Sequence, residues 1–227
     1  NTDSPITITQ SIRTLRVIAV GEGGAGTTFQ SSCNATNGDD GADTTFMGIT
    51  ASGGEAASWF TKGAGGGATA TAGTILSSSS GDDGTNGSSL GTKGTGGEGH
   101  TFTSPSLGSI TKGAGGDGGG EGYCRPGEAC QDLGGSCESN PCSPTWQPPN
   151  QPEVWSYNGT CRDVSDLSTR SCCYYYDFPY RGGGGGAGGF IEVHFSQSEL
   201  TSYYGSQSYS VNSAGSGELN GFLEVIY

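Results

Sequence analysis

The residues with the clearest chemistry in this sequence are its cysteines, which number eight. Five of them lie between Cys124 and Cys161, in a polar stretch with no apolar segment that could bury free thiols. An even set of cysteines in such a stretch predicts disulfide bonds in an oxidising compartment, although the spacing does not decide their pairing. Zinc is disfavoured, because the sequence has no CxxC pair and only two histidines. The cysteines predicted to form disulfides are Cys33, Cys124, Cys130, Cys137, Cys142, Cys161, Cys172 and Cys173.

Three N-glycosylation motifs point to the same compartment. Asn34, Asn86 and Asn158 each begin an N-x-S/T motif within polar, loop-like sequence. The sequence starts at Asn1 and has no apolar targeting segment near this end. We therefore expect the mature form of a secreted glycoprotein, located outside the cell or on its surface.

A group of carboxylates offers oxygen ligands for a metal ion. Asp39, Asp40 and Asp43 surround a short Gly-rich segment, but they lack the spacing and terminal glutamate of an EF-hand. The sequence leaves open whether they form an ordinary solvated turn or whether a weak calcium site lies here or near Asp82 and Asp83, and it indicates no other metal or cofactor. The net charge of −13 argues against nucleic-acid binding, and no apolar run is long enough to insert into a membrane.

Two enzyme-like motifs occur without the elements that they require. Residues 21–26 match GxGxxG after a predicted strand, but the following residues, TTFQSSCNATNG, are not those of an amphipathic helix. Residues 87–91 match GxSxG, but Gly, Ser and Asp surround them in place of a buried strand and a helix. The sequence therefore predicts that this chain is not an enzyme.

Aromatic side chains gather near the cysteines and allow two interpretations. They form either a surface that binds glycans or proteins, or the small core of a disulfide-rich segment. The residues in question are Trp146, Trp155, Tyr174, Tyr175 and Tyr176.

Short apolar segments at the two ends of the chain predict β-strands. Residues 5–20 are rich in Ile, Val and Thr and form either two strands separated at Gln10 and Ser11 or one long strand. Residues 189–193 and 221–225 share the pattern Gly-Phe-(Ile/Leu)-Glu-Val, and the strands expected at residues 190–195 and 222–227 each have one apolar face. The terminal strand, with Phe222, Leu223, Val225 and Tyr227, is the candidate for pairing with another copy. No segment has helical periodicity.

The middle of the chain contains too few apolar residues for an ordinary core. There are 45 glycines, and the hydrophobic fraction is 31%. A TKGxGG motif occurs at residues 61–66, 92–97 and 111–116, and GDDG at 38–41 and 81–84. We expect stacked glycine runs of polyproline II type that bond main chain to main chain, since buried amides and carbonyls need partners. The expected fold is mainly β with an irregular glycine-rich bundle of polyproline or polyglycine II type, stapled by disulfides and almost free of α-helix.

This arrangement resembles a known family. A Thr/Ile-rich strand, a turn and the segment LRVIAVGEGGAG at residues 15–26, with a glycine run and strand at residues 182–195, resemble the glycine-rich domain of phage tail and bacterial surface proteins. The cysteine-rich segment departs from that pattern and has some similarity to the glycine-rich ectodomain of anaplastic-lymphoma-type receptor kinases. The resemblance implies a polyglycine II bundle braced by strands, with a structural or receptor-binding role.

The expected organisation is a single structural unit with three segments. Residues 1–122 hold the N-terminal strands and the glycine-rich bundle, residues 123–180 the insert rich in cysteine, proline and aromatic residues, and residues 181–227 the closing glycine run with two strands. The sequence favours a subunit of an extracellular fibre, filament or appendage that associates with itself or with other structural proteins by strand addition. The alternative is an adhesin or receptor-binding module for glycans or proteins.

Overall fold

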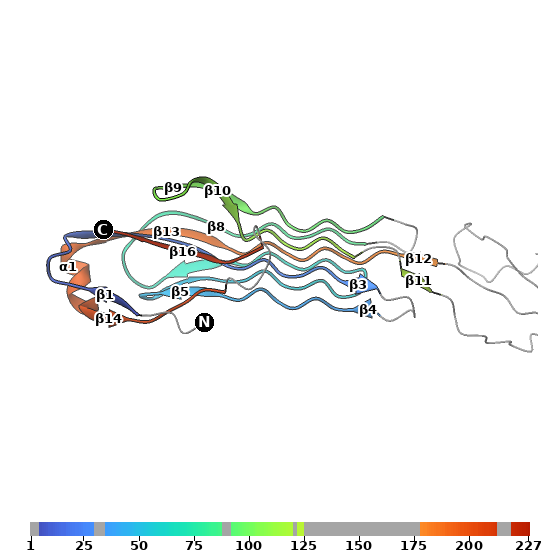
Figure 1. Ribbon diagram of the computed structural model, residues 1–227, viewed down its shortest axis with the longest axis horizontal. Helices are drawn as coiled ribbons and strands as arrows, with labels where there is room; N and C mark the ends of the chain where they lie inside the picture. The colour runs from blue at the N-terminus through green and yellow to red at the C-terminus, as the bar shows by residue number, and fades with distance from the viewer. Residues whose placement is uncertain (1–4, 30–34, 88–91, 120–121, 125–177, 213–218) are drawn as a thin grey trace, which may run out of the picture.

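A computed structural model describes residues 5–29, 35–87, 92–119, 122–124, 178–212 and 219–227 of the chain. The described part is elongated (Figure 1). Sheets and the two termini lie toward one end, and nearly parallel extended segments fill the middle.

Two antiparallel four-stranded sheets form a β-sandwich at one end. The first sheet has the order β16 (Phe222–Ile226), β2 (Thr14–Val20), β13 (Phe190–Ser196), β8 (Thr74–Ser79). The second has the order β15 (Tyr209–Ser210), β5 (Thr44–Phe46), β6 (Ile49–Ala51), β7 (Ala68–Ala70). The strands predicted at residues 190–195 and 222–227 are thereby confirmed, as is the mainly β fold.

Smaller elements complete the described fold. The two-stranded pairs are β1 (Ile6–Ile8) with β14 (Gly205–Gln207), β9 (His100–Ser104) with β10 (Gly108–Lys112), β3 (Thr28–Phe29) with β4 (Ala35–Thr36), and β11 (Gly122–Cys124) with β12 (Phe178–Tyr180). Residues 5–20 thus contain two strands, but these pair with other partners and not with each other. Helix α1 (Gln197–Leu200) and the 3₁₀ turn Thr201–Tyr203 were not predicted, because such short helices leave no periodicity in the sequence.

The main core lies between the two four-stranded sheets. The predicted apolar face of β13, formed by Ile191, Val193 and Phe195, is fully buried there. Leu223 and Val225 from β16 pack against the same cluster, as their alternation predicted. The other members of this core are Ile8, Leu15, Val17, Ala19, Phe46, Met47, Ile49, Ala51 and Leu200.

A second, smaller cluster covers part of the outer face of the first sheet. Ile18, Val20 and Phe190 are buried there. The β9–β10 hairpin supplies Phe102, whose ring centroid lies 5.4 Å from that of Phe190 and 5.3 Å from that of Phe222. The hairpin therefore covers the outer face of the first sheet at β16 and leaves the free edge of that strand unpaired.

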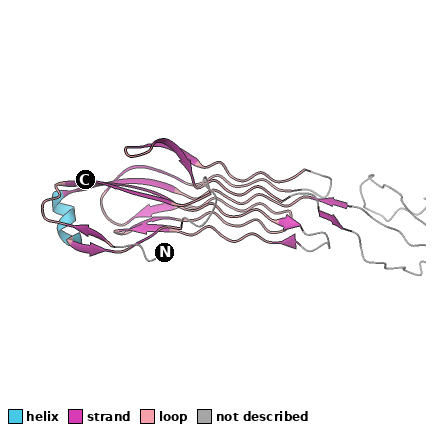
Figure 2. Ribbon diagram, viewed as in Figure 1, coloured by secondary structure: helices cyan, strands magenta, loops and turns pink. Residues whose placement is uncertain are grey.

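Eight extended segments continue the strands away from the sandwich, and we call them the glycine bundle (Figure 2). They comprise residues 21–27, 37–42, 52–60, 61–67, 80–87, 92–99, 113–119 and 182–189. Residues 21–27 directly follow β2, for example, and residues 182–189 directly precede β13. Each strand thus sets the direction and the position of the run that adjoins it.

Residues 182–189, the central run, are bonded to six other runs. Their amides donate to three runs: Gly183, Gly186 and Gly189 to residues 52–60, Gly184 and Ala187 to residues 80–87, and Gly185 and Gly188 to residues 113–119. Their carbonyls accept from the amides of three more runs. The donors are Gly21, Gly24 and Thr27 in residues 21–27, Gly63 and Gly66 in residues 61–67, and Gly94 and Gly97 in residues 92–99. All these N···O distances are 2.8–3.0 Å. Every third amide therefore meets the same neighbour, which is the repeat of a helix with three residues per turn.

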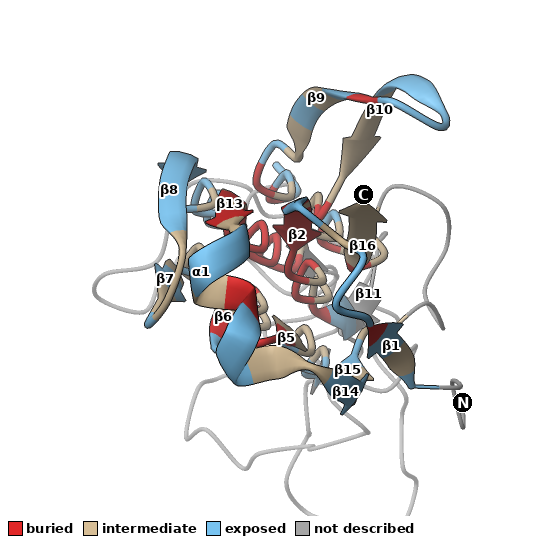
Figure 3. Ribbon diagram, turned by 90° about the vertical axis from the view of Figure 1, so that its left-hand side faces the viewer, coloured by how far each residue is buried: buried red, intermediate tan, exposed pale blue. Residues whose placement is uncertain are grey.

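The six surrounding runs are also bonded to one another and close a ring. Around the ring, bonds join residues 21–27 to 52–60, 52–60 to 61–67, 61–67 to 80–87, 80–87 to 92–99, 92–99 to 113–119, and 113–119 to 21–27. Residues 37–42 lie outside the ring and bond to both 21–27 and 52–60. In the view along the long axis, the buried residues accordingly gather in the middle of the molecule (Figure 3).

This spacing leaves no room for side chains between the runs. A Cβ atom added to Gly185 would lie 2.0 Å from the carbonyl oxygen of Gly24, and one on Gly184 would lie 2.0 Å from that of Thr95. These neighbours are backbone atoms and cannot move aside as a flexible side chain would. Glycine is therefore required by contact distance, whereas Gly67 has no atom within 4 Å of its added Cβ.

We predict that Gly185→Ala destabilises the chain by about 3 kcal/mol, the upper part of the usual range for overpacking, because the added methyl group separates two hydrogen-bonded main chains. The matched control Gly67→Ala is expected to be neutral or to stabilise by up to about 1 kcal/mol, since it only reduces the freedom of the unfolded chain. Thermal and denaturant unfolding measure both. Equal stabilities of the two variants would contradict the steric argument.

Candidate functional site

The carboxylates considered for calcium bind main-chain amides. The Asp40 carboxylate accepts a hydrogen bond from the Ala56 amide at 2.7 Å, and the Asp43 carboxylate accepts one from Gly53 at 2.9 Å. Asp39 contributes its backbone carbonyl to the Ala25 amide. These exposed residues lie in or directly after an extended run, and the structure does not decide between the two interpretations. Within the described ranges no group of three or more metal-ligating side chains is present.

Asn37 precedes Asp40 by three residues, as Asp40 precedes Asp43. Its side-chain oxygen accepts a hydrogen bond from the Trp59 amide at 3.3 Å. Asn37, Asp40 and Asp43 thus satisfy every third amide on the outer side of residues 52–60. These three amides donate to side-chain oxygens of the adjacent segment in place of main-chain carbonyls, so their need for a hydrogen-bond partner is met. The sequence analysis missed this role, although the three-residue spacing of Asn and Asp was visible.

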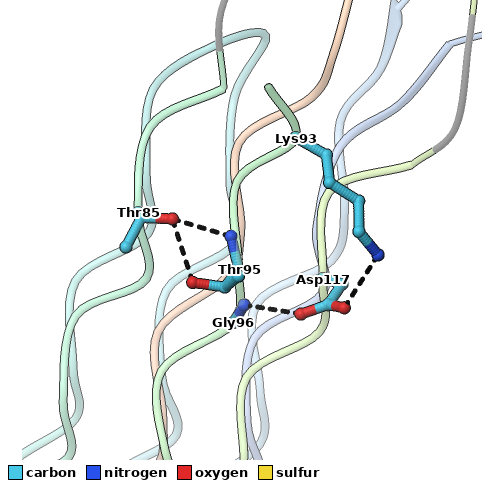
Figure 4. Close-up of polar contacts among 5 residues, drawn as sticks. All are labelled: Thr85, Lys93, Thr95, Gly96 and Asp117. Carbon is cyan, nitrogen blue, oxygen red and sulfur yellow. Dashed lines mark hydrogen bonds and ion pairs between the residues drawn. The ribbon is translucent and has the colours of Figure 1, made fainter. Parts of the chain in front are cut away.

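The second GDDG motif meets the first TKGxGG motif in space. Asp83, from the second GDDG segment, accepts from the Lys62 ammonium at 2.6 Å and from the Gly65 amide at 3.0 Å. The carboxylate of Asp117 makes the same pair of contacts with Lys93 at 3.1 Å and Gly96 at 2.9 Å (Figure 4). In both cases one aspartate joins two runs, bridging a lysine and the amide three residues after it.

These contacts change the acidity of the two aspartates. The hydrogen bond from Lys62, and then that from the Gly65 amide, hold the pKa of Asp83 below its ordinary value. The hydrogen bond from the Gly96 amide, and then that from Lys93, do the same to the pKa of Asp117. Both carboxylates are about half exposed, so each ion pair contributes little on its own.

The first five amides of the nucleotide-like segment, those of residues 21–25, all donate to main-chain carbonyls of the fold and not to a phosphate. The amides of Gly21 and Gly24 donate to the central run, and that of Gly23 donates to the Leu219 carbonyl. Strand β3 follows this segment, where a nucleotide-binding fold would place a helix. The glycines at these positions are explained by close contact between main chains.

Among the predicted site residues, those of the terminal strand are all described by the structure. β16 pairs antiparallel with β2, with Phe222 opposite Val20 and Ile226 opposite Arg16. Leu223 and Val225 face the main core, and Tyr227 is 65% exposed. β16 is an edge strand, so its outer side has no neighbouring strand within the described part of the chain.

A polar contact also joins β16 to the β9–β10 hairpin. The Glu224 carboxylate accepts a hydrogen bond from the Ser106 amide at 3.1 Å, at the turn of the β9–β10 hairpin. On the same sheet face, Arg16 pairs with Glu192 at 2.7 Å. This hydrogen bond chiefly raises the pKa of Arg16, with a further contribution from the negative charge of Glu224. Arg16 on β2 therefore interacts electrostatically with Glu192 on β13 and Glu224 on β16.

Other predicted site residues lie outside the described residues. This applies to Trp146, Trp155, Tyr174, Tyr175, Tyr176, Asn34, Asn158 and all the cysteines except Cys124, which lies on β11. The remaining glycosylation candidate, Asn86, is exposed, and its side-chain oxygen accepts from the Lys62 amide at 2.9 Å. The disulfide and aromatic-surface predictions therefore stay predictions.

No protein-family model, curated protein or solved structure matches this chain. The resemblance to glycine-rich domains therefore remains an expectation from the sequence. In the described ranges, no helix has the length and apolar character needed to span a membrane.

We predict that acid weakens the fold through Asp83 and Asp117. Because folding lowers their pKa, their contribution to stability is complete above the ordinary aspartate value of about 4 and is lost as the pH falls through the folded value. Melting temperatures measured from pH 7 to pH 2 should fall less steeply for the double variant Asp83→Asn and Asp117→Asn. The control is Asp82→Asn, since Asp82 contributes its backbone carbonyl to Ala187. An unchanged slope in the double variant would refute the assignment.

Proposed function

We propose that this chain is a non-enzymatic structural subunit of an extracellular fibre, filament or surface appendage. The observation that carries the proposal is the central run, which is hydrogen-bonded to six surrounding runs. Bending or shearing such a bundle requires many main-chain bonds to break together. The bundle is therefore suited to a stiff rod built from a chain with few apolar side chains.

The bundle is best explained as polyglycine II packing. Each run bonds to different neighbours at successive residues, and the pattern repeats after three. Among the glycines of the described runs, only Gly113 has a positive φ, and the rest have the sign that this conformation requires. Disulfides between the predicted cysteines would staple the rod and fit an oxidising compartment.

Assembly by strand exchange follows from the way β16 is held. β16 completes the first sheet by pairing with β2, and the residues before it, Leu219 and Asn220, accept amide bonds from the bundle. A second copy offers the same β2 edge, so β16 can make identical contacts within its own chain or with a neighbour. Exchange of an identical element between copies costs little free energy, and it joins copies head to tail.

A binding module is the second candidate, and the position of strands β11 and β12 favours it. Strands β11 and β12 flank the insert, and they lie at the end of the bundle opposite the sandwich (Figure 1). A segment rich in aromatic residues would thereby be presented at a tip, as an adhesin for glycans or proteins requires. A stable monomer in light scattering that binds glycans on an array would favour this candidate over the fibre.

We predict that the fibre depends on pairing of β16 with the β2 of another copy. Arg16→Cys and Ile226→Cys lie directly opposite in the register. When the two single variants are mixed, unfolded and refolded together under assembly conditions, oxidation should link different chains, and mass spectrometry should find the two new cysteines in one cross-linked peptide.

The control mixes Ile226→Cys with Ile75→Cys, which lies on β8 at the other edge of the sheet. This mixture should give no link. If instead the link forms only when both Arg16→Cys and Ile226→Cys are in one chain, the strand stays in its own chain, and assembly by exchange is wrong.

A further inference from the structure

Strand β8 is an exposed sheet edge that no strand covers within the described part of the chain. It is the last strand of the first sheet and pairs only with β13. All six of its residues are exposed, including Ile75 at 48% and Leu76 at 54%. Figure 3 shows β8 on the outside of the molecule. An edge of this kind can accept a further strand.

β8 lacks the usual protection of an exposed edge. Natural edges are commonly blocked by charged residues or proline, but residues 63–81 contain neither. A register shift between Glu192 and Val193 of β13 leaves Leu76 without a directly paired residue. This irregularity brings two adjacent apolar side chains to the surface, where a partner could cover them.

The net charge of the described residues differs between the sandwich and the glycine bundle. The sandwich and its hairpin have three basic residues, Arg13, Arg16 and Lys112, and three acidic ones, Glu192, Glu199 and Glu224. The glycine bundle with its connections is strongly acidic. Its acidic residues are Glu22, Asp39, Asp40, Asp43, Glu55, Asp82, Asp83, Glu98 and Asp117, against Lys62, Lys93 and Arg181.

We propose that β8 is a second interface, at which it pairs antiparallel with β8 of a second copy about a two-fold axis. A strand that adds here must have one unpaired edge of its own, and it must bring no charge against Ile75 and Leu76. The β8 edge of another copy meets both conditions. A basic partner would instead be drawn to the acidic bundle.

The charge distribution also selects the direction of pairing. β8 runs along the long axis and leads directly into residues 80–87 of the bundle (Figure 1). In a parallel pair the two acidic bundles would lie side by side and repel each other. In an antiparallel pair the bundles point in opposite directions, and only the neutral sandwiches meet. The resulting dimer carries its two β11–β12 pairs at opposite ends.

This interface goes beyond the proposed fibre contact and does not require it. β16 and β8 are opposite edges of one sheet, so strand exchange at β16 leaves β8 free. The two contacts can therefore be tested separately. The cross-link between Arg16→Cys and Ile226→Cys reports only on the first, and a charge on β8 disrupts only the second.

The test uses the full chain and compares two equivalent charge changes. Leu76→Lys places a charge on the β8 edge, whereas Leu107→Lys places it on the hairpin turn, where Leu107 is 61% exposed. Sedimentation velocity over a concentration series should show a dimer for the wild type and for Leu107→Lys. The dimer should be weaker by at least about ten-fold in Leu76→Lys. Added salt should strengthen the wild-type dimer, because each copy has a net charge of −13.

Circular dichroism checks that each variant is folded, and Ser78→Lys is a second edge variant that is expected to behave like Leu76→Lys. Small-angle scattering should give a dimer clearly longer than the monomer, as the antiparallel arrangement requires. A wild type that stays monomeric, equal weakening by Leu107→Lys, or a dimer no longer than the monomer would each overturn the proposal.

Discussion

The structure depends on main-chain hydrogen bonding between the central run and the six runs around it. An amide and a carbonyl on adjacent extended chains come within 2.8–3.0 Å of each other only where no Cβ atom lies between them. In the runs of the bundle, the size of the side chain and not its hydrophobicity therefore determines which residue a position can hold. It explains why the central run is glycine at every position except Ala187.

The strands and the bundle determine each other. A glycine run has a high conformational entropy in the unfolded chain, so ordering it alone is unfavourable. Each run is continuous with a strand, and the two packed sheets hold those strands in fixed positions through a core that includes Leu15, Ile49 and Phe195. The sandwich thus supplies the hydrophobic burial that the bundle lacks, and the bundle extends its order along the long axis.

The outer surface of the bundle follows from the same requirement for hydrogen-bond partners. On the outer side of the bundle, some amides donate to side-chain oxygens of an adjacent run, such as those of Asp40, Asp83 and Asp117, in place of main-chain carbonyls. Much of the acidity of the chain is thereby a structural property of the bundle edge. It also leaves the sandwich as the surface on which copies can approach with the least repulsion.

The sequence by itself determined the local elements: the strands at residues 190–195 and 222–227 from their alternation, and main-chain bonding between glycine runs from the scarcity of apolar residues. It left the roles of Asp39, Asp40 and Asp43 open, and it gave no indication that β8 is an exposed edge. Only the tertiary structure decided that residues 182–189 occupy the centre, that Asp83 meets Lys62, and that β16 pairs with β2. Glycine runs have no side chains to distinguish them, so their neighbours are chosen by the strands that they continue, through contacts between residues far apart in the chain.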